Sequence, residues 1–291
     1  MKGINMSAKS NCIQKYTVNG ITFKMKSFYD FSFLGKYGKV FKVFDDQDSG
    51  NICFGIEKDG KKYFVKFAGS PTAEYNGNPK DAIERLKAAM PIYQALHHEN
   101  LIELVNCEDI GDGFAMIFKW SDGDCMGRMY KDEHNRFMQL PIADKLNVFF
   151  DILDFLEYVN SNGYVAVDFY DGSIIYDYAN KKTTICDIDY FEKMPYINNM
   201  GRMFGSAKFM SPEEFEKGAD IDEITNVYTA GAFAFALFGN YSRNIDDWKL
   251  SDELFTVASK AVSDNRDERY SSINEFRKAW CRYEKRISEN N

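Results

Sequence analysis

The chain has 291 residues, of which 45% are apolar and 16% aromatic, and its net charge is −8. This length is enough to bury a substantial core, in one large domain or in two lobes. The acidic balance argues against a protein that neutralises the phosphate backbone of a nucleic acid.

The six cysteines are widely scattered, with no Cys-x-x-Cys pair and no cluster of cysteine and histidine. This spacing indicates neither a disulfide framework nor a zinc site, and it is typical of reduced thiols in the cytosol. No apolar run approaches the length of a membrane span, and the first residues lack the apolar region of a signal peptide. We therefore expect a soluble, cytoplasmic, globular protein with no membrane partner.

Short apolar and alternating runs, broken by glycine, aspartate and asparagine, fill the first part of the chain. They predict strands, with a hairpin turn at Asp59–Gly60, over residues 38–46, 51–67 and 114–120. One helix is predicted over residues 79–96, where Pro91 should kink or split it.

Helical spacing dominates after about residue 120. Two helices are predicted over residues 222–239 and 271–287, and a third over residues 140–163. The third has an apolar stripe formed by Ile142, Leu146, Phe149, Phe150, Leu153 and Leu156. A strand-rich first part and a helix-rich second part predict an α+β fold with two lobes, and a cleft between lobes is a common place for a ligand.

Two glycines, Gly35 and Gly38, sit three apart between two strand-like runs, with Val40 two positions on. A glycine turn lets backbone amides approach phosphate oxygens without a Cβ in the way. An ordinary hairpin explains the same spacing.

Lys66 lies inside an apolar strand run, where an unpaired ammonium would be costly. Glu84, 18 positions on in the predicted helix, is a candidate acidic partner, and Glu74 and Asp81 are rivals. A lysine that faces solvent from an edge strand is the alternative.

Two aspartates interrupt or follow short apolar runs in the helix-rich second part of the chain. Asp168 interrupts the run over residues 164–178, and Asp187 follows 19 positions later. Carboxylates at the ends of neighbouring strands can hold a divalent cation and orient a hydroxyl between them. Taken singly, either aspartate is explained by a turn.

A further carboxylate, Glu213, follows a predicted helix start in which Ser211 is the cap and Pro212 lies in the first turn. Far downstream, Arg269 is a candidate partner for Glu213 in a buried ion pair.

In chain order these motifs resemble those of protein kinases, over about residues 28–286. "LGKYGKV" looks like a shortened glycine-rich loop, "FVKF" like the strand with the nucleotide-binding lysine, and "VAVDFYDGSII" like the catalytic loop. "CDID" is similar to the metal-binding DFG motif. "GSAKFMSPEE" is similar to the end of a Ser/Thr kinase activation segment, with Ser206 at the threonine position. "TNVYTAGAFAFALFG" resembles the central helix of the large lobe.

The resemblance implies a two-lobed protein kinase-like fold, with ATP and Mg²⁺ as cofactors. Its expected parts are an N-terminal extension, an N-lobe and a C-lobe, over residues 1–27, 28–120 and 121–291. The resemblance makes Asp168 and Lys66 catalytic residues. It assigns ATP binding to Gly35, Gly38, Val40, Lys66 and Glu84, and Mg²⁺ binding to Asp187 and Ser173.

Several positions depart from the kinase pattern. Ala166-Val167 replace the His-Arg before the catalytic aspartate, Tyr170 replaces a lysine, and Ser173 replaces an asparagine. Asp189 stands at the final glycine of DFG, and Asn226 at the buried aspartate of the central helix. Without the arginine, a phosphate on the activation segment has no evident anchor.

Two functions therefore stay open: an ATP-dependent phosphotransferase of the Ser/Thr protein kinase kind, and a pseudokinase that serves as a nucleotide-binding or scaffolding module. A small-molecule kinase of the aminoglycoside or choline type shares the fold, but the Ser-Pro-Glu run and Arg269 favour a protein kinase. The sequence does not identify the protein substrate or partner.

Overall fold

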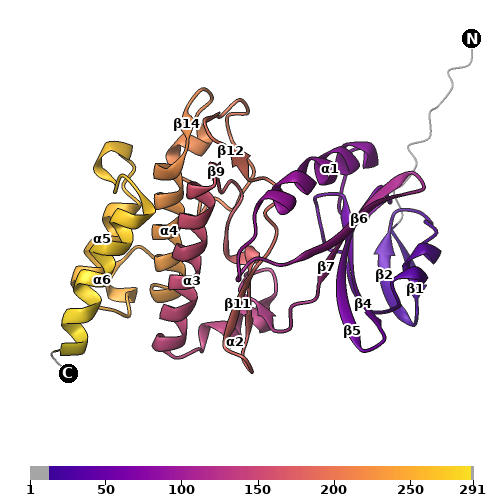
Figure 1. The fold of residues 1–291 in the computed structure, drawn as a ribbon, viewed down its shortest axis with the longest axis horizontal. Helices are drawn as coiled ribbons and strands as arrows, with labels where there is room; N and C mark the ends of the chain where they lie inside the picture. Colours follow the sequence, from indigo (N-terminus) through magenta and orange to yellow (C-terminus); the bar gives the residue numbers. More distant parts are fainter. Residues whose placement is uncertain (1–12, 290–291) are drawn as a thin grey trace, which may run out of the picture. The chain divides into compact units, whose positions relative to one another are not determined.

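The structure is a computed structural model that describes residues 13–289, with side chains described for residues 13–283. It divides into two compact units (Figure 1). One contains the described residues up to Pro91 together with Glu103–Trp120, and the other contains Ile92–Ile102 and the described residues from Ser121 on. The first unit holds a five-stranded sheet and the second is mainly helical, so the predicted α+β class is confirmed and is consistent with a two-lobed kinase-like fold.

The sheet of the first unit is antiparallel, in the order β3-β4-β5-β7-β6. Its strands are β3 Lys39–Phe44, β4 Asn51–Lys58, β5 Lys61–Ala68, β6 Leu104–Ile110 and β7 Gly113–Lys119. The predicted hairpin between β4 and β5 is confirmed. Asp59 and Gly60 have φ values of 52° and 73°, the left-handed pair that a tight two-residue hairpin turn requires.

A separate hairpin precedes this sheet, formed by β1 (Gln14–Val18) and β2 (Ile21–Met25). Phe23 and Met25 are buried in the same apolar cluster as the inner side chains of the sheet. Residues 14–25 of the expected N-terminal extension therefore pack into the first unit. Its residues 1–12 lie outside the described part of the chain.

The helix predicted over residues 79–96 is present as α1, Pro79–Ala95. It runs on through Pro91, so of the two effects expected of this proline, a kink or a split, the split does not occur. A proline removes one N–H from the helix, and the buried side chains Leu86 and Ala89 before it and Tyr93 after it stabilise the helix on both sides.

The glycine run differs from the sequence prediction. Gly35 lies in a short 3-10 helix, η1 (Ser32–Lys36), and not between two strands. Gly38 precedes β3 with a φ of 132°, and a Cβ built on it would lie 2.2 Å from the carbonyl oxygen of Glu57 in β4. The close approach of two backbones thus requires a glycine at position 38.

The helices of the second unit are α2 Lys131–Met138, α3 Ile142–Ser161, α4 Glu223–Phe238, α5 Asp252–Ala261 and α6 Ile273–Glu289. Its strands are short: β8 Asp124–Cys125, β9 Tyr164–Val165, β10 Ile174–Asp177, β11 Lys182–Ile185, β12 Glu192–Lys193, β13 Tyr196–Ile197 and β14 Asp220–Ile221. Helices α3 and α4 lie side by side, and α4 is buried from Thr225 to Phe238 (Figure 1). No helix within residues 13–289 has the length and apolar character needed to cross a membrane.

The apolar stripe predicted on α3 is largely confirmed, because Phe149, Leu153 and Leu156 are fully buried. Leu146 and Phe150 are partly buried, and Ile142 is 37% exposed at the first position of the helix, before α3 reaches the core.

The two glycines provide a matched pair for a stability test. We expect Gly38→Ala to lower the free energy of unfolding by about 1–3 kcal/mol, because the new Cβ meets a backbone carbonyl and the residue has a positive φ. Gly35→Ala should change it by less than about 0.5 kcal/mol, since a Cβ there meets nothing within 4 Å. Urea unfolding of the two variants gives the comparison, and equal losses would contradict this packing.

Candidate active site

Asp168 and Asp187, the two aspartates singled out by the sequence, both belong to the second unit. Asp168 follows β9, and Asp187 lies two residues after β11. Their φ values are 58° and 57°, in the left-handed region that few residues other than glycine adopt. Such a conformation costs of order 1 kcal/mol or more and persists only where the surroundings impose it. The structure therefore fixes the backbone at both carboxylates.

A buried amide on α4 holds the chain just before Asp168. The Oδ1 atom of Asn226 accepts a hydrogen bond of 3.0 Å from the backbone N–H of Ala166, and its Nδ2 donates to Oδ1 of Asn160 on α3 at 2.6 Å. Asn226 is fully buried. The asparagine that departs from the kinase pattern thus ties the Asp168 loop to two core helices.

The side chains around Asp168 pack as the apolar pattern predicts. Val165, Val167 and Ile174 are buried, and Ile175 is partly buried. Ala166 and Val167, which stand where kinases have His-Arg, are apolar core positions here. Asp168 itself is half-buried and Asp187 is exposed.

Tyr170 lies among the carboxylates of this loop. Burial of the phenol, followed by the negative charges of Asp187 and Asp168, raises the pKa of Tyr170 well above its usual value of 10. The phenol therefore stays protonated and uncharged at neutral pH. Burial likewise raises the pKa of the nearby Cys125 thiol to about 12, which makes this thiol a poor nucleophile at neutral pH.

Ser173, the predicted second metal ligand, is fully buried in the turn η2 (Asp171–Ser173). Its Oγ has no hydrogen-bond partner within the described part of the chain. Those residues also contain no group of three or more His, Cys, Asp or Glu side chains arranged to hold a metal ion. Mg²⁺ bound to a nucleotide needs only one or two protein carboxylates, so the exposed Asp187 fits such an ion better than the buried Ser173 does.

Asp189, which stands at the position of the DFG glycine, has a structural role. Asp189 accepts a hydrogen bond of 2.9 Å from the hydroxyl of Tyr93, and the same hydroxyl accepts one from the N–H of Ile188 at 3.1 Å. The last turn of α1 is thereby bound to the segment that follows Asp187. No sequence motif indicated this contact.

The remaining predicted nucleotide residues lie in the first unit. Lys66 is 9% exposed on the central strand β5, opposite Cys53 of β4 and Met116 of β7. It is not on an edge strand. Glu84 is exposed on α1, and Val40 is buried in the apolar cluster of the sheet. The pairing of Lys66 with Glu84 stays a prediction.

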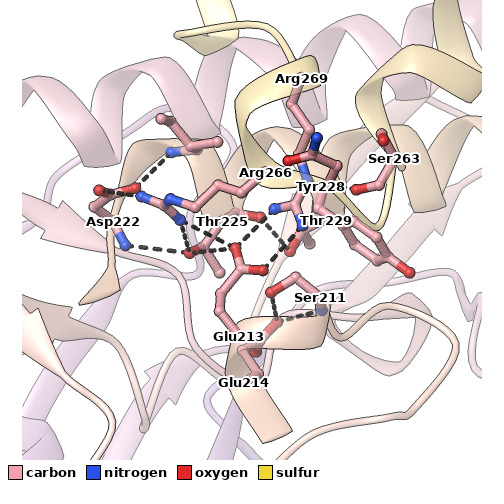
Figure 2. A network of polar contacts seen from close by, with 12 residues as sticks. Ser211, Glu213, Glu214, Asp222, Thr225, Tyr228, Thr229, Ser263, Arg266 and Arg269 are labelled. Carbon is pink, nitrogen blue, oxygen red and sulfur yellow. Dashed lines mark hydrogen bonds and ion pairs between the residues drawn. The ribbon is translucent and has the colours of Figure 1, made fainter. Parts of the chain in front are cut away.

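The predicted ion pair between Glu213 and Arg269 is confirmed (Figure 2). Arg269 donates two parallel hydrogen bonds to Glu213, from Nη1 to Oε1 at 2.7 Å and from Nη2 to Oε2 at 2.9 Å, and both residues are buried. Burial alone would raise the pKa of Glu213, but the hydrogen bonds and charge of Arg269 outweigh it and hold the pKa below its ordinary value. Glu213 therefore stays ionised at neutral pH.

The sequence analysis missed three further members of this network. Arg266 donates to Oε1 of Glu213 at 3.1 Å and also to Asp222, the N-cap of α4, and Thr225 donates to the same Glu213 oxygen at 3.0 Å. Arg266 precedes Arg269 by three residues. This second cation in the same turn is the feature of the sequence that could have indicated another partner for Glu213. The end of the segment before Glu213 is thus bound to α4 and to the turn before α6.

The neighbouring Glu214 binds Ser211, the residue at the N-terminus of the short helix that contains both glutamates. Its Oε2 accepts hydrogen bonds from the backbone N–H of Ser211 at 2.6 Å and from the Ser211 hydroxyl at 2.9 Å. The predicted start at Ser211, with Pro212 in the first turn, is confirmed as the 3-10 helix η3, Pro212–Phe215. Burial raises the pKa of Glu214 to about 7, and the hydrogen bonds from Ser211 oppose that shift only in part.

Comparison with known proteins points in one direction. Among curated proteins, the chain is 23% identical over 131 residues to the serine/threonine-protein kinase srb10 of Schizosaccharomyces pombe. The match is to a protein kinase. It covers 44% of this chain and 33% of the relative, so the chain spans about a third of the length of the protein it matches. No family model matches the chain. The similarity supports a distant kinase-like relationship.

Because Glu213 and Arg269 form a buried ion pair, we expect a large loss of stability when the Glu213 side chain is truncated. Glu213→Ala should lower the free energy of unfolding by about 3–5 kcal/mol, because it leaves the Arg269 guanidinium buried and unpaired. Glu216→Ala, three residues on and exposed, is the control and should change it by less than about 0.5 kcal/mol. Denaturant unfolding of both variants is the measurement, and similar values for the two would refute a stabilising role for the pair.

Glu214 predicts a dependence of stability on pH. Because its pKa is raised to about 7 in the folded state, the bound proton stabilises the fold below the ordinary pKa of 4.5. This contribution is lost as the pH rises through about 7. The free energy of unfolding of wild type relative to Glu214→Gln should therefore fall by roughly 3 kcal/mol between pH 4.5 and pH 8. If the free energy of unfolding of the two proteins changes with pH in the same way, the pKa of Glu214 is not raised in the folded state and the prediction is wrong.

Proposed function

We propose that this protein transfers the γ-phosphate of ATP to a hydroxyl group of a protein substrate. The observation that carries the proposal is the pair Asp168 and Asp187, each held in a left-handed conformation and each acting electrostatically on the Tyr170 phenol. Phosphoryl transfer in kinases uses two carboxylates, one to orient the acceptor hydroxyl and one to hold a divalent cation. The distant similarity to a serine/threonine protein kinase supports the same reaction.

The proposed roles follow from exposure and position. Asp168, half-buried on its tethered loop, orients the acceptor hydroxyl and takes up its proton late in the reaction. Asp187, exposed, provides the carboxylate for Mg²⁺. Lys66, on β5, binds the α- and β-phosphates. Mg-ATP itself supplies the phosphoryl group and the metal charge that neutralises it.

Tyr170 gives this chain a neutral donor where kinases have a lysine. Its raised pKa keeps the O–H intact at physiological pH, so it can donate one hydrogen bond but adds no positive charge. Stabilisation of charge on the transferred group therefore rests on Lys66 and the metal.

A second function, a nucleotide-binding or scaffolding pseudokinase, is favoured by two observations. Ser173 is fully buried, and Gly35 lies in the 3-10 helix η1. Both positions belong to motifs that hold metal or phosphate in the resemblance to kinases. This function requires nucleotide binding without transfer, or no nucleotide binding at all.

Nucleotide titration separates the proposed roles. Wild type should bind ATP, and Lys66→Ala should weaken binding by at least about tenfold, since a charged contact to phosphate typically contributes 1.5–3 kcal/mol. Asp187→Asn should reduce the gain in affinity that Mg²⁺ provides, whereas Asp168→Asn should bind Mg-ATP almost as wild type does. Calorimetry with and without Mg²⁺ measures all four proteins. A folded Lys66→Ala variant with unchanged affinity would defeat the assignment of Lys66.

A further inference from the structure

The segment before Glu213 has an unusual charge for this chain. Residues 193–212 contain Lys193, Arg202 and Lys208 and no aspartate or glutamate, although the whole chain has 44 acidic and 36 basic residues. An uninterrupted positive stretch in an acidic protein is a candidate binding surface for an anionic partner.

Arg202 places one of these charges beside the candidate catalytic loop. Its guanidinium donates hydrogen bonds to the carbonyl oxygens of Met203 at 3.0 Å and Gly205 at 3.1 Å. Gly205 in turn lies against the loop, because a Cβ built on it would be 3.7 Å from Cα of Asp168. Arg202 is therefore held near Asp168 by the backbone of its own segment.

Tyr241 brings two more cations to the same loop. Its hydroxyl donates to Oδ2 of the buried Asp171 at 2.7 Å, three residues after Asp168. The Arg128 guanidinium lies 4.5 Å from the centroid of the Tyr241 ring and the Lys208 ammonium 5.7 Å from it. Both distances are within the range in which a cation is attracted by an aromatic ring.

The three cations of this surface, Arg128, Arg202 and Lys208, outnumber the two carboxylates near them, Asp168 and Asp171. Asp171 offsets Arg128 in part, with 3.6 Å between Oδ2 and Nε. Arg202 and Lys208 have no carboxylate partner within the described part of the chain, and all three cations are exposed. Burial and Asp171 raise the pKa of Tyr241 far above its usual value, so its phenol adds no negative charge.

We propose that Arg128, Arg202 and Lys208, here called the basic surface, bind an acidic protein segment, in which aspartate or glutamate residues flank the hydroxyl to be phosphorylated. Exposed apolar side chains beside Arg202, Met200 at 50% and Phe204 at 42%, suit a polypeptide better than a small molecule. Phosphorylation of that segment rests on the proposed function, whereas binding of the segment to the basic surface does not. The basic surface thus defines a substrate class for the site.

The test is the binding of two fluorescein-labelled serine peptides, measured by fluorescence anisotropy at low salt. One peptide has glutamates on both sides of the serine, and the other has lysines at the same positions. Wild type should bind the glutamate peptide at least about tenfold more tightly, and the preference should shrink as salt screens the charges. Lys208→Gln and Arg202→Gln should each weaken binding of the glutamate peptide about two- to fivefold, and Lys208→Glu should weaken it further.

Lys260→Gln is the matched control. Lys260 is also an exposed lysine over a tyrosine ring, 4.4 Å from the centroid of Tyr270, and it lies on α5 outside the basic surface. This variant should bind both peptides as wild type does. Equal affinity for the two peptides, or an equal loss in Lys260→Gln and Lys208→Gln, overturns the proposal. Charge-selective binding without any transfer of phosphate would sustain it and would count against the proposed enzyme activity alone.

Discussion

The hydrogen bond between the Asn226 amide and the N–H of Ala166 is the constraint on which the candidate site depends. It joins the fully buried Asn226 of α4 to the residue two positions before Asp168. A left-handed aspartate costs of order 1 kcal/mol or more, and it keeps that conformation only if its neighbours cannot relax. The core helix supplies this rigidity, and the buried side chains of Val165 and Val167 add to it. An amide can replace a carboxylate at position 226 because the atom that matters is one acceptor oxygen, while its N–H₂ group finds Asn160.

The Glu213–Arg269–Arg266 network and the basic surface have different roles. The Glu213–Arg269–Arg266 network is buried and paired, so it fixes the end of the 193–212 segment against the helices. The basic surface is exposed, and two of its cations, Arg202 and Lys208, form no ion pair within the described part of the chain. Buried pairs hold a structure in place, whereas exposed charges act through steering and selection of partners. A segment that is fixed at its end and presents exposed cations is suited to binding an anionic partner.

The sequence predicts those parts of the fold that depend on local conformational preferences or on the high cost of burying an unpaired charge. Alternating strands and the Asp59–Gly60 turn follow from local preferences, and the Glu213–Arg269 pair follows because few charges are buried without a partner. Gly35 was misplaced because glycine spacing alone does not distinguish a 3-10 turn from a loop between strands. The Tyr241–Asp171 and Tyr93–Asp189 contacts join residues 70 and 96 positions apart, and only the folded chain brings such residues together.

Transfer of labelled phosphate tests the central claim most directly. Wild type and Asp168→Asn would be incubated with Mg²⁺ and γ-labelled ATP, together with a mixture of serine peptides, and the label on peptide and protein counted. The account predicts incorporation by wild type and its loss in a folded Asp168→Asn variant that still binds Mg-ATP. Equal incorporation by the two proteins, or none by wild type with any divalent metal, would contradict the role of Asp168 in phosphoryl transfer.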